Sequence, residues 1–118
     1  MSKYDLKKLE HENPEEKTAL EKKHVPHIQA PEKVKKGEYF DVTITMGKEI
    51  EHPMEPNHYI QYVELYADYY QLARVDFTAE AKAEVTLTVK LEESCTLRSF
   101  IYCNLHDQWE AAKEITVE

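Results

Sequence analysis

Phe40-Asp41-Val42-Thr43-Ile44-Thr45-Met46 decides the fold class, because apolar and polar residues alternate along it without a break. Successive side chains of a β-strand point to opposite faces, so this pattern predicts a strand with one buried face and one face in water. The stretch from Glu84 to Val89 alternates with the same period. We therefore expect both stretches to belong to sheets that cover a common core.

Working outward from these two stretches, period-two patterns continue along most of the chain. We predict strands at 25–29, 40–46, 59–66, 71–78, 83–90, 96–103 and 113–117. About seven strands with short connections indicate an all-β fold, an immunoglobulin-like antiparallel β-sandwich. With 118 residues the chain is expected to form a single domain over 1–118, with the sandwich at 24–118.

The first 23 residues form a charged N-terminal segment in which we predict one short helix. Asn13 is the expected N-cap, and Pro14 suits the first helical position. The helix is predicted to run to about Lys22, because Pro26 disfavours helical geometry at the residue before it.

Composition excludes several classes of protein. A net charge of −8 argues against broad nucleic-acid binding, which needs a basic face. No stretch approaches the roughly 20 apolar residues of a membrane-spanning helix, and the N-terminus lacks a signal-like apolar core, so we expect a cytoplasmic protein. If Cys95 and Cys103 lie on one strand, they are about 26 Å apart at about 3.3 Å per residue, too far to form a disulfide.

Cys103 and His106 are three residues apart and can turn toward one metal ion. His24, His52 and His58 are upstream, each predicted at a strand end or in a loop, where binding residues often collect. One sulfur and four nitrogens suit iron or copper better than Mg²⁺ or Ca²⁺, which prefer oxygen. Structural zinc fits less well, because it closes with four ligands and usually more than one cysteine.

Copper on a cupredoxin-like sandwich is the alternative, which would make the protein a non-enzymatic electron carrier. Such a site uses two histidines, one cysteine and a weak axial methionine. Met46 and Met54 are the candidates for that methionine, and both are far upstream of His106. Two of the four histidines would then have no role.

Four segments in order resemble the superoxide reductases, also called neelaredoxins and desulfoferrodoxins. They are Lys23-His24-Val25-Pro26, Gly47-Lys48-Glu49-Ile50-Glu51-His52-Pro53, Asn57-His58-Tyr59-Ile60 and Tyr102-Cys103-Asn104-Leu105-His106. The resemblance runs from about Glu21 to the C-terminus. Longer members add an N-terminal rubredoxin-like domain with four cysteines, which this chain does not have, so it resembles the one-iron, neelaredoxin-type form.

The resemblance implies an enzyme that reduces superoxide by one electron to hydrogen peroxide at a single non-haem iron. It implies four equatorial nitrogens and an axial sulfur, supplied here by His24, His52, His58, His106 and Cys103. Electrons would come from an external donor such as rubredoxin, and the protein would be a homotetramer or dimer. Backbone N–H groups of Leu105 and His106 are expected to hydrogen-bond the sulfur.

Residues beside the implied ligands supply a candidate positive charge and depart from the family pattern. Lys23, beside His24, is the candidate for attracting superoxide, the alternative being an ordinary solvated lysine. Family members commonly have Glu-Lys before the first ligand histidine, and that glutamate caps the sixth position of ferric iron. Here Lys22 stands in its place and Glu21 is one residue early, so either Glu21 or a solvent molecule would be the sixth ligand. Asp107 stands where a glycine is frequent.

Overall fold

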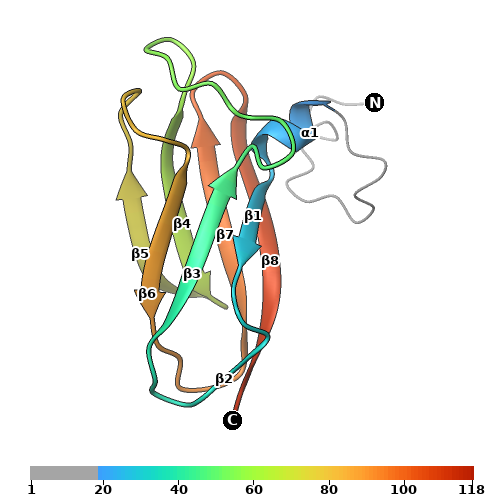
Figure 1. Cartoon of the computed structure of the whole chain (residues 1–118), viewed down its shortest axis with the longest axis vertical. Coiled ribbons are helices and arrows are strands. Elements are labelled where there is room, and N and C mark those ends of the chain that lie inside the picture. The colour runs from blue at the N-terminus through green and yellow to red at the C-terminus, as the bar shows by residue number, and fades with distance from the viewer. Residues whose placement is uncertain (1–18) are drawn as a thin grey trace.

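The computed structural model describes residues 19–118, which form one helix and eight strands (Figure 1). In chain order they are α1 (Ala19–His24), β1 (Pro26–Gln29), β2 (Lys33–Val34), β3 (Phe40–Met46), β4 (Ile60–Ala67), β5 (Tyr70–Asp76), β6 (Glu84–Val89), β7 (Cys95–Cys103) and β8 (Asp107–Val117). The predicted all-β sandwich is confirmed.

Two sheets pack face to face. One has the strand order β1-β3-β6 and the other the order β2-β8-β7-β4-β5. In Figure 1 the smaller sheet lies in front of β4, β7 and β8. All pairings are antiparallel except that of β2 with β8, which is parallel and two residues long. The predicted strands do not include β2, a short edge strand.

The core lies between the sheets and follows from the alternating pattern. Val42 and Ile44 of β3 are fully buried, and so are Leu97 and Ile101 on the facing sheet. Full burial of a side chain of this size contributes roughly 1.5–3 kcal/mol. The polar residues between them, such as Thr43, stay near the surface, where Thr43 and Thr86 hydrogen-bond across β3 and β6 at 2.9 Å.

Two predicted boundaries are wrong. The helix continues through His24 instead of stopping at about Lys22, because the Val25 N–H closes one more turn on the Glu21 carbonyl at 2.8 Å. The last strand begins at Asp107 instead of Lys113, since it pairs with β7 from Asp107 to Ile115. The predicted cap at Asn13 and Pro14 lies outside the described residues.

The fold brings three chain segments to one end of the sandwich. Helix α1, the long β3–β4 connection and the β7–β8 turn lie together at the upper end in Figure 1. Strand β7 runs toward this end, so Cys103 lies there and Cys95 lies at the opposite end. Among the described residues no helix is long and apolar enough to cross a membrane.

Candidate metal centre

Five potential metal ligands converge at the upper end. Donor atoms of His24, His58, Cys103 and His106 all lie within 4.8 Å of one another. The Nε2 atom of His52 joins them, 3.0 Å from Nε2 of His24 and 3.4 Å from the Cys103 sulfur. The sequence had singled out all five, and the structure places them in one cluster, which we call the His₄Cys cluster.

Four members of the cluster lie at or close to the end of an element, and His52 lies within the β3–β4 connection. His24 is the last residue of α1, and Cys103 is the last residue of β7. His58 precedes β4 and is held by paired backbone hydrogen bonds with Glu55, both of 3.0 Å. His106 ends the tight turn into β8. Element ends suit this purpose, because a rigid sheet fixes them while their side chains remain free to point inward.

The four imidazole rings form the sides of a square. Neighbouring ring centroids are 4.6 Å apart for His24 and His52, 4.9 Å for His52 and His58, 5.1 Å for His58 and His106, and 4.8 Å for His106 and His24. His24 and His58 face each other across the square at 6.4 Å. Four nitrogens therefore surround one central point, with the Cys103 sulfur close to them.

Hydrogen bonds fix which nitrogen of two histidines faces that point. His24 Nδ1–H donates to the Leu20 carbonyl at 2.7 Å, and His52 Nδ1–H donates to the Pro53 carbonyl at 2.6 Å. In a neutral imidazole the other nitrogen is then an unprotonated acceptor. The two Nε2 atoms, 3.0 Å apart, thus present lone pairs to each other with no proton between them. A cation at the centre resolves this conflict.

The distances fit a metal ion. Two nitrogens each about 2.1 Å from one ion and at right angles lie about 3.0 Å apart, whereas tetrahedral angles would separate them by about 3.4 Å. The pairs His24–His52 and His24–His106 are 3.0 and 3.2 Å apart. The buried Nε2 of His58 has no hydrogen-bond partner within residues 19–118, as expected for a metal ligand. These features make the cluster a candidate metal centre.

Burial prepares two of the histidines for metal binding. It lowers the pKa of His24 and of His52 from 6.5 to about 4, and the neighbouring histidines add to the effect. Both are therefore neutral at pH 7, the form that binds metal. Burial also raises the pKa of the Cys103 thiol, opposed by hydrogen bonds from the backbone N–H groups of Leu105 and His106. The predicted N–H contacts to the sulfur are thus present.

Lys23 contributes positive charge to the cluster. Its ammonium group adds to the lowering of the pKa of both His52 and His58, for which burial is the main cause. Glu21 lies three residues before His24 in α1, and one of its carboxylate oxygens is buried. The converging donor atoms found among residues 19–118 include no carboxylate.

Two backbone positions with positive φ shape the loops around the cluster. Asp107 has a φ of 65°, so the turn keeps the left-handed conformation that the usual glycine would favour. Gly47, with a φ of 77°, begins the loop that carries His52. A Cβ on Gly47 would lie 2.4 Å from the backbone nitrogen of His52 and 2.6 Å from the Ile50 carbonyl oxygen. Only glycine allows this loop to close.

Sequence reasoning missed the roles of two residues near the cluster. The Asn104 side chain accepts from the Tyr59 N–H at 2.8 Å and donates to the Asn57 carbonyl at 3.0 Å, which ties the β7–β8 turn to the segment of His58. Trp109 stacks on His24 and donates to the His106 carbonyl. The available signal was that the chain has one tryptophan, three residues after His106.

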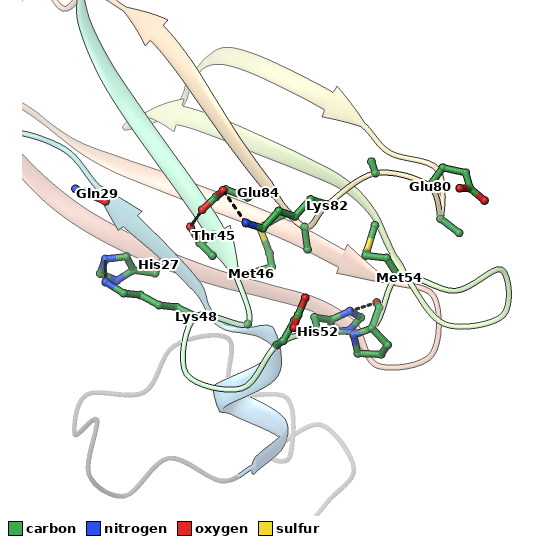
Figure 2. A pocket seen from close by; sticks show the side chains of 16 residues that line it. His27, Gln29, Thr45, Met46, Lys48, His52, Met54, Glu80, Lys82 and Glu84 are labelled. Carbon is green, nitrogen blue, oxygen red and sulfur yellow. Dashed lines mark hydrogen bonds and ion pairs between the residues drawn. The ribbon is translucent and has the colours of Figure 1, made fainter.

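A groove of about 930 Å³ beside the cluster reaches it only through His52 (Figure 2). Its walls combine apolar residues such as Met46 and Met54 with polar and charged ones. Among the latter, Glu84 accepts a hydrogen bond from Thr45 at 2.9 Å and forms an ion pair with Lys82 at 3.5 Å. His52 is only 2% exposed, so the groove does not open onto the donor atoms. Access for a small molecule is on the side of His58 and His106, which are half-buried.

Comparisons with known proteins agree with this geometry. Residues 16–112 match the family model described as desulfoferrodoxin. A Methanocaldococcus jannaschii protein is 49% identical over 107 residues, which cover 87% of this chain and 90% of that protein. Superoxide reductase from Pyrococcus furiosus is 34% identical, and the match covers 81% of this chain and 89% of that protein. The solved structure of superoxide reductase (neelaredoxin) from Ignicoccus hospitalis has 44% identity and a TM-score of 0.74, covering 80% of this chain and 81% of that one.

Proposed function

The chain belongs to the desulfoferrodoxin family, and we propose that it is a superoxide reductase, an enzyme that reduces superoxide to hydrogen peroxide. The observation that carries this function is the His₄Cys cluster, in which the side chains of one cysteine and four histidines lie together. Relatives named superoxide reductase match most of the chain, and the matching family model spans residues 16–112, which include all five residues.

We propose that the cluster holds one non-haem iron per chain, with His24, His52, His58, His106 and Cys103 as its ligands. The donor set supports iron, because imidazoles and a thiolate together bind redox-active transition metals and not Mg²⁺ or Ca²⁺. Bound iron would supply the one-electron step, in which superoxide takes up an electron and two protons and leaves as hydrogen peroxide.

The residues of the chain would assist this reaction in two ways. Lys23 places a positive charge beside the cluster of a protein whose net charge is −8, so it would draw the anionic substrate to the correct place. The Leu105 and His106 N–H groups hydrogen-bond the Cys103 sulfur, which favours the thiolate over the thiol. Neutral imidazoles leave the positive charge of the metal uncompensated, which also attracts an anion.

The sixth position of the ferric centre would be taken either by the Glu21 carboxylate or by a solvent molecule. Substituting Glu21→Ala and following the ferric charge-transfer band with pH separates these two cases. An unchanged spectrum shows that Glu21 is not a ligand, whereas a shifted band and a shifted transition pH show that it is.

We further propose that an external electron carrier, such as rubredoxin, re-reduces the protein in the cytoplasm, and that the protein assembles as a homotetramer or dimer. Steady-state reduction by rubredoxin and sedimentation of the iron-loaded protein test these two statements. Neither the electron donor nor the oligomeric state bears on the metal centre, so the failure of either statement would leave the proposed reductase activity intact.

The decisive experiment is pulse radiolysis of the reduced, iron-loaded protein. We expect each superoxide consumed to oxidise one iron and to yield one hydrogen peroxide, without release of dioxygen. Metal analysis provides the companion measurement, with about one iron and no copper per chain. A protein purified with copper and inert to superoxide would instead be a cupredoxin-like electron carrier.

A further inference from the structure

We propose that Trp109 is a positioning residue of the metal centre, holding His24 and His106 at the separation that one ion requires. This inference rests on the His₄Cys cluster being a metal centre, as proposed above. Trp109 lies on the inner face of β8 and is 5% exposed. It contacts two of the five proposed ligands through two different parts of its side chain.

The first contact is ring stacking on His24. The two ring centroids are 5.2 Å apart and the ring planes are 23° from parallel. The hydrogen bond from His24 Nδ1 to the Leu20 carbonyl restrains turning of the imidazole in the plane of the ring. The indole ring restrains the remaining motion, rotation of the imidazole out of that plane. Together the two contacts leave Nε2 pointing at the centre of the cluster.

The second contact is a hydrogen bond to the backbone of His106. The indole Nε1–H donates to the His106 carbonyl oxygen at 2.8 Å. The following residue, Asp107, is in the left-handed region with a φ of 65°, so the turn needs support at this point. Trp109 itself is fixed by pairing with Ile101 in the sheet. The indole thus connects the turn that carries His106 to the rigid part of the fold.

The two contacts join segments that local structure cannot hold together. His24 and His106 are 82 residues apart in sequence, yet His24 Nε2 and His106 Nδ1 are 3.2 Å apart. The six described residues of α1 make little more than one turn, and a helix that short does not hold its own position. Trp109 contacts both segments and so restrains both proposed ligands. Other buried residues fill the core, but this indole also donates to the carbonyl of a ligand.

The test compares Trp109→Phe with Ile115→Val. Phenylalanine keeps an aromatic ring against His24 and removes the N–H that His106 accepts. Ile115 provides the control, because it lies on the same face of β8 and is 2% exposed, but pairs with Cys95 at the opposite end. Co²⁺ affinity of the metal-free variants is measured by competition with a chromophoric chelator, together with the visible spectrum of the cobalt form.

We expect Trp109→Phe to weaken Co²⁺ binding about 10- to 100-fold, the usual effect of losing a group that orients a ligand. Its cobalt absorption bands should also shift. Ile115→Val should retain wild-type affinity and spectrum although its thermal stability falls. Unchanged affinity in Trp109→Phe, or an equal loss in both variants, would overturn the positioning role. A wild-type chain that binds no Co²⁺ would instead contradict the metal centre itself.

A second measurement needs no substitution. Trp109 is the only tryptophan of the chain, so indole fluorescence reports on this residue alone. Because its ring is in contact with a proposed ligand, paramagnetic Co²⁺ should quench the emission in proportion to the site filled, up to one ion per chain. Stoichiometric Co²⁺ binding without quenching would refute the contact, even if Trp109→Phe failed to fold.

Discussion

Cys95 and Cys103 lie at opposite ends of the same strand and on the same inner face, yet their surroundings differ. Burial raises the pKa of both thiols. At Cys95 the carboxylates of Asp68 and Glu93 raise it further. At Cys103 the Asp107 carboxylate also raises it, but two backbone N–H groups oppose the rise, and His52 Nε2 lies 3.4 Å from the sulfur. Position on the strand therefore does not make a cysteine a ligand; the loops that surround it do.

The two glycines of the chain repeat this comparison. Gly37 and Gly47 have nearly the same conformation, with φ values of 75° and 77°. A Cβ on Gly37 would meet only a Glu92 oxygen at 3.9 Å, whereas on Gly47 it would collide with the backbone of His52. The β3–β4 connection is thus closely packed at Gly47, whereas the β2–β3 connection leaves open space at Gly37.

The largest expected effect is that of Cys103→Ser against Cys95→Ser. Removing the Cys103 thiolate takes away the only sulfur of the cluster, so superoxide reduction measured by pulse radiolysis should be abolished. Cys95→Ser changes the same atom at the other end and should leave turnover unchanged. Retained activity in Cys103→Ser would refute the thiolate's role.

Acidification should destabilise the metal end in the metal-free protein. His24 and His52 have folded pKa values of about 4, below 6.5 in the unfolded chain, so the unfolded state binds more protons between these values. Unfolding free energy should therefore fall as pH drops from 6.5 toward 4, by about 1.4 kcal/mol per histidine at about pH 5.5. Urea denaturation across this range provides the measurement. Equal slopes in the wild type and in His24→Gln would contradict the assignment.

Gly47→Ala should cost more stability than Gly37→Ala. Both substitutions force alanine into the left-handed region, at about 1–2 kcal/mol. Gly47→Ala must in addition move the backbone of His52, for a total of about 3 kcal/mol or more. Urea denaturation gives the two costs. Co²⁺ affinity should fall in Gly47→Ala alone, and equal behaviour of the two variants would show that the clash is relieved without moving His52.

The smallest effect expected is that of Lys23→Ala against Lys90→Ala. Both remove one positive charge, but only Lys23 adds to the field at His52 and His58. Lys23→Ala should slow the reaction with superoxide by up to about tenfold at low ionic strength and flatten its salt dependence. Lys90, which lies over the Tyr39 ring, should matter little. Parallel salt profiles for the two variants would make Lys23 an ordinary surface lysine.

The alternating stretches were sufficient to predict the sandwich, because one-sided burial imposes a period of two wherever a strand covers a core. Strand β8 shows where this signal ends. Its first half contains Glu110-Ala111-Ala112, which has little strand character, and pairing with β7 determines its structure instead. Strand β2 is two residues long and has no period to detect.

The sequence by itself determined the ligand types, since imidazole and thiolate chemistry belongs to the residues wherever they fold. It also determined the alternating strands, such as β3 and β6, that cover the core. Only the tertiary structure decided which ring nitrogen faces the metal, since this depends on carbonyls at Leu20 and Pro53. The same holds for Trp109, because its contacts cross 85 residues of chain, from 24 to 109, and no local pattern records so distant a partner.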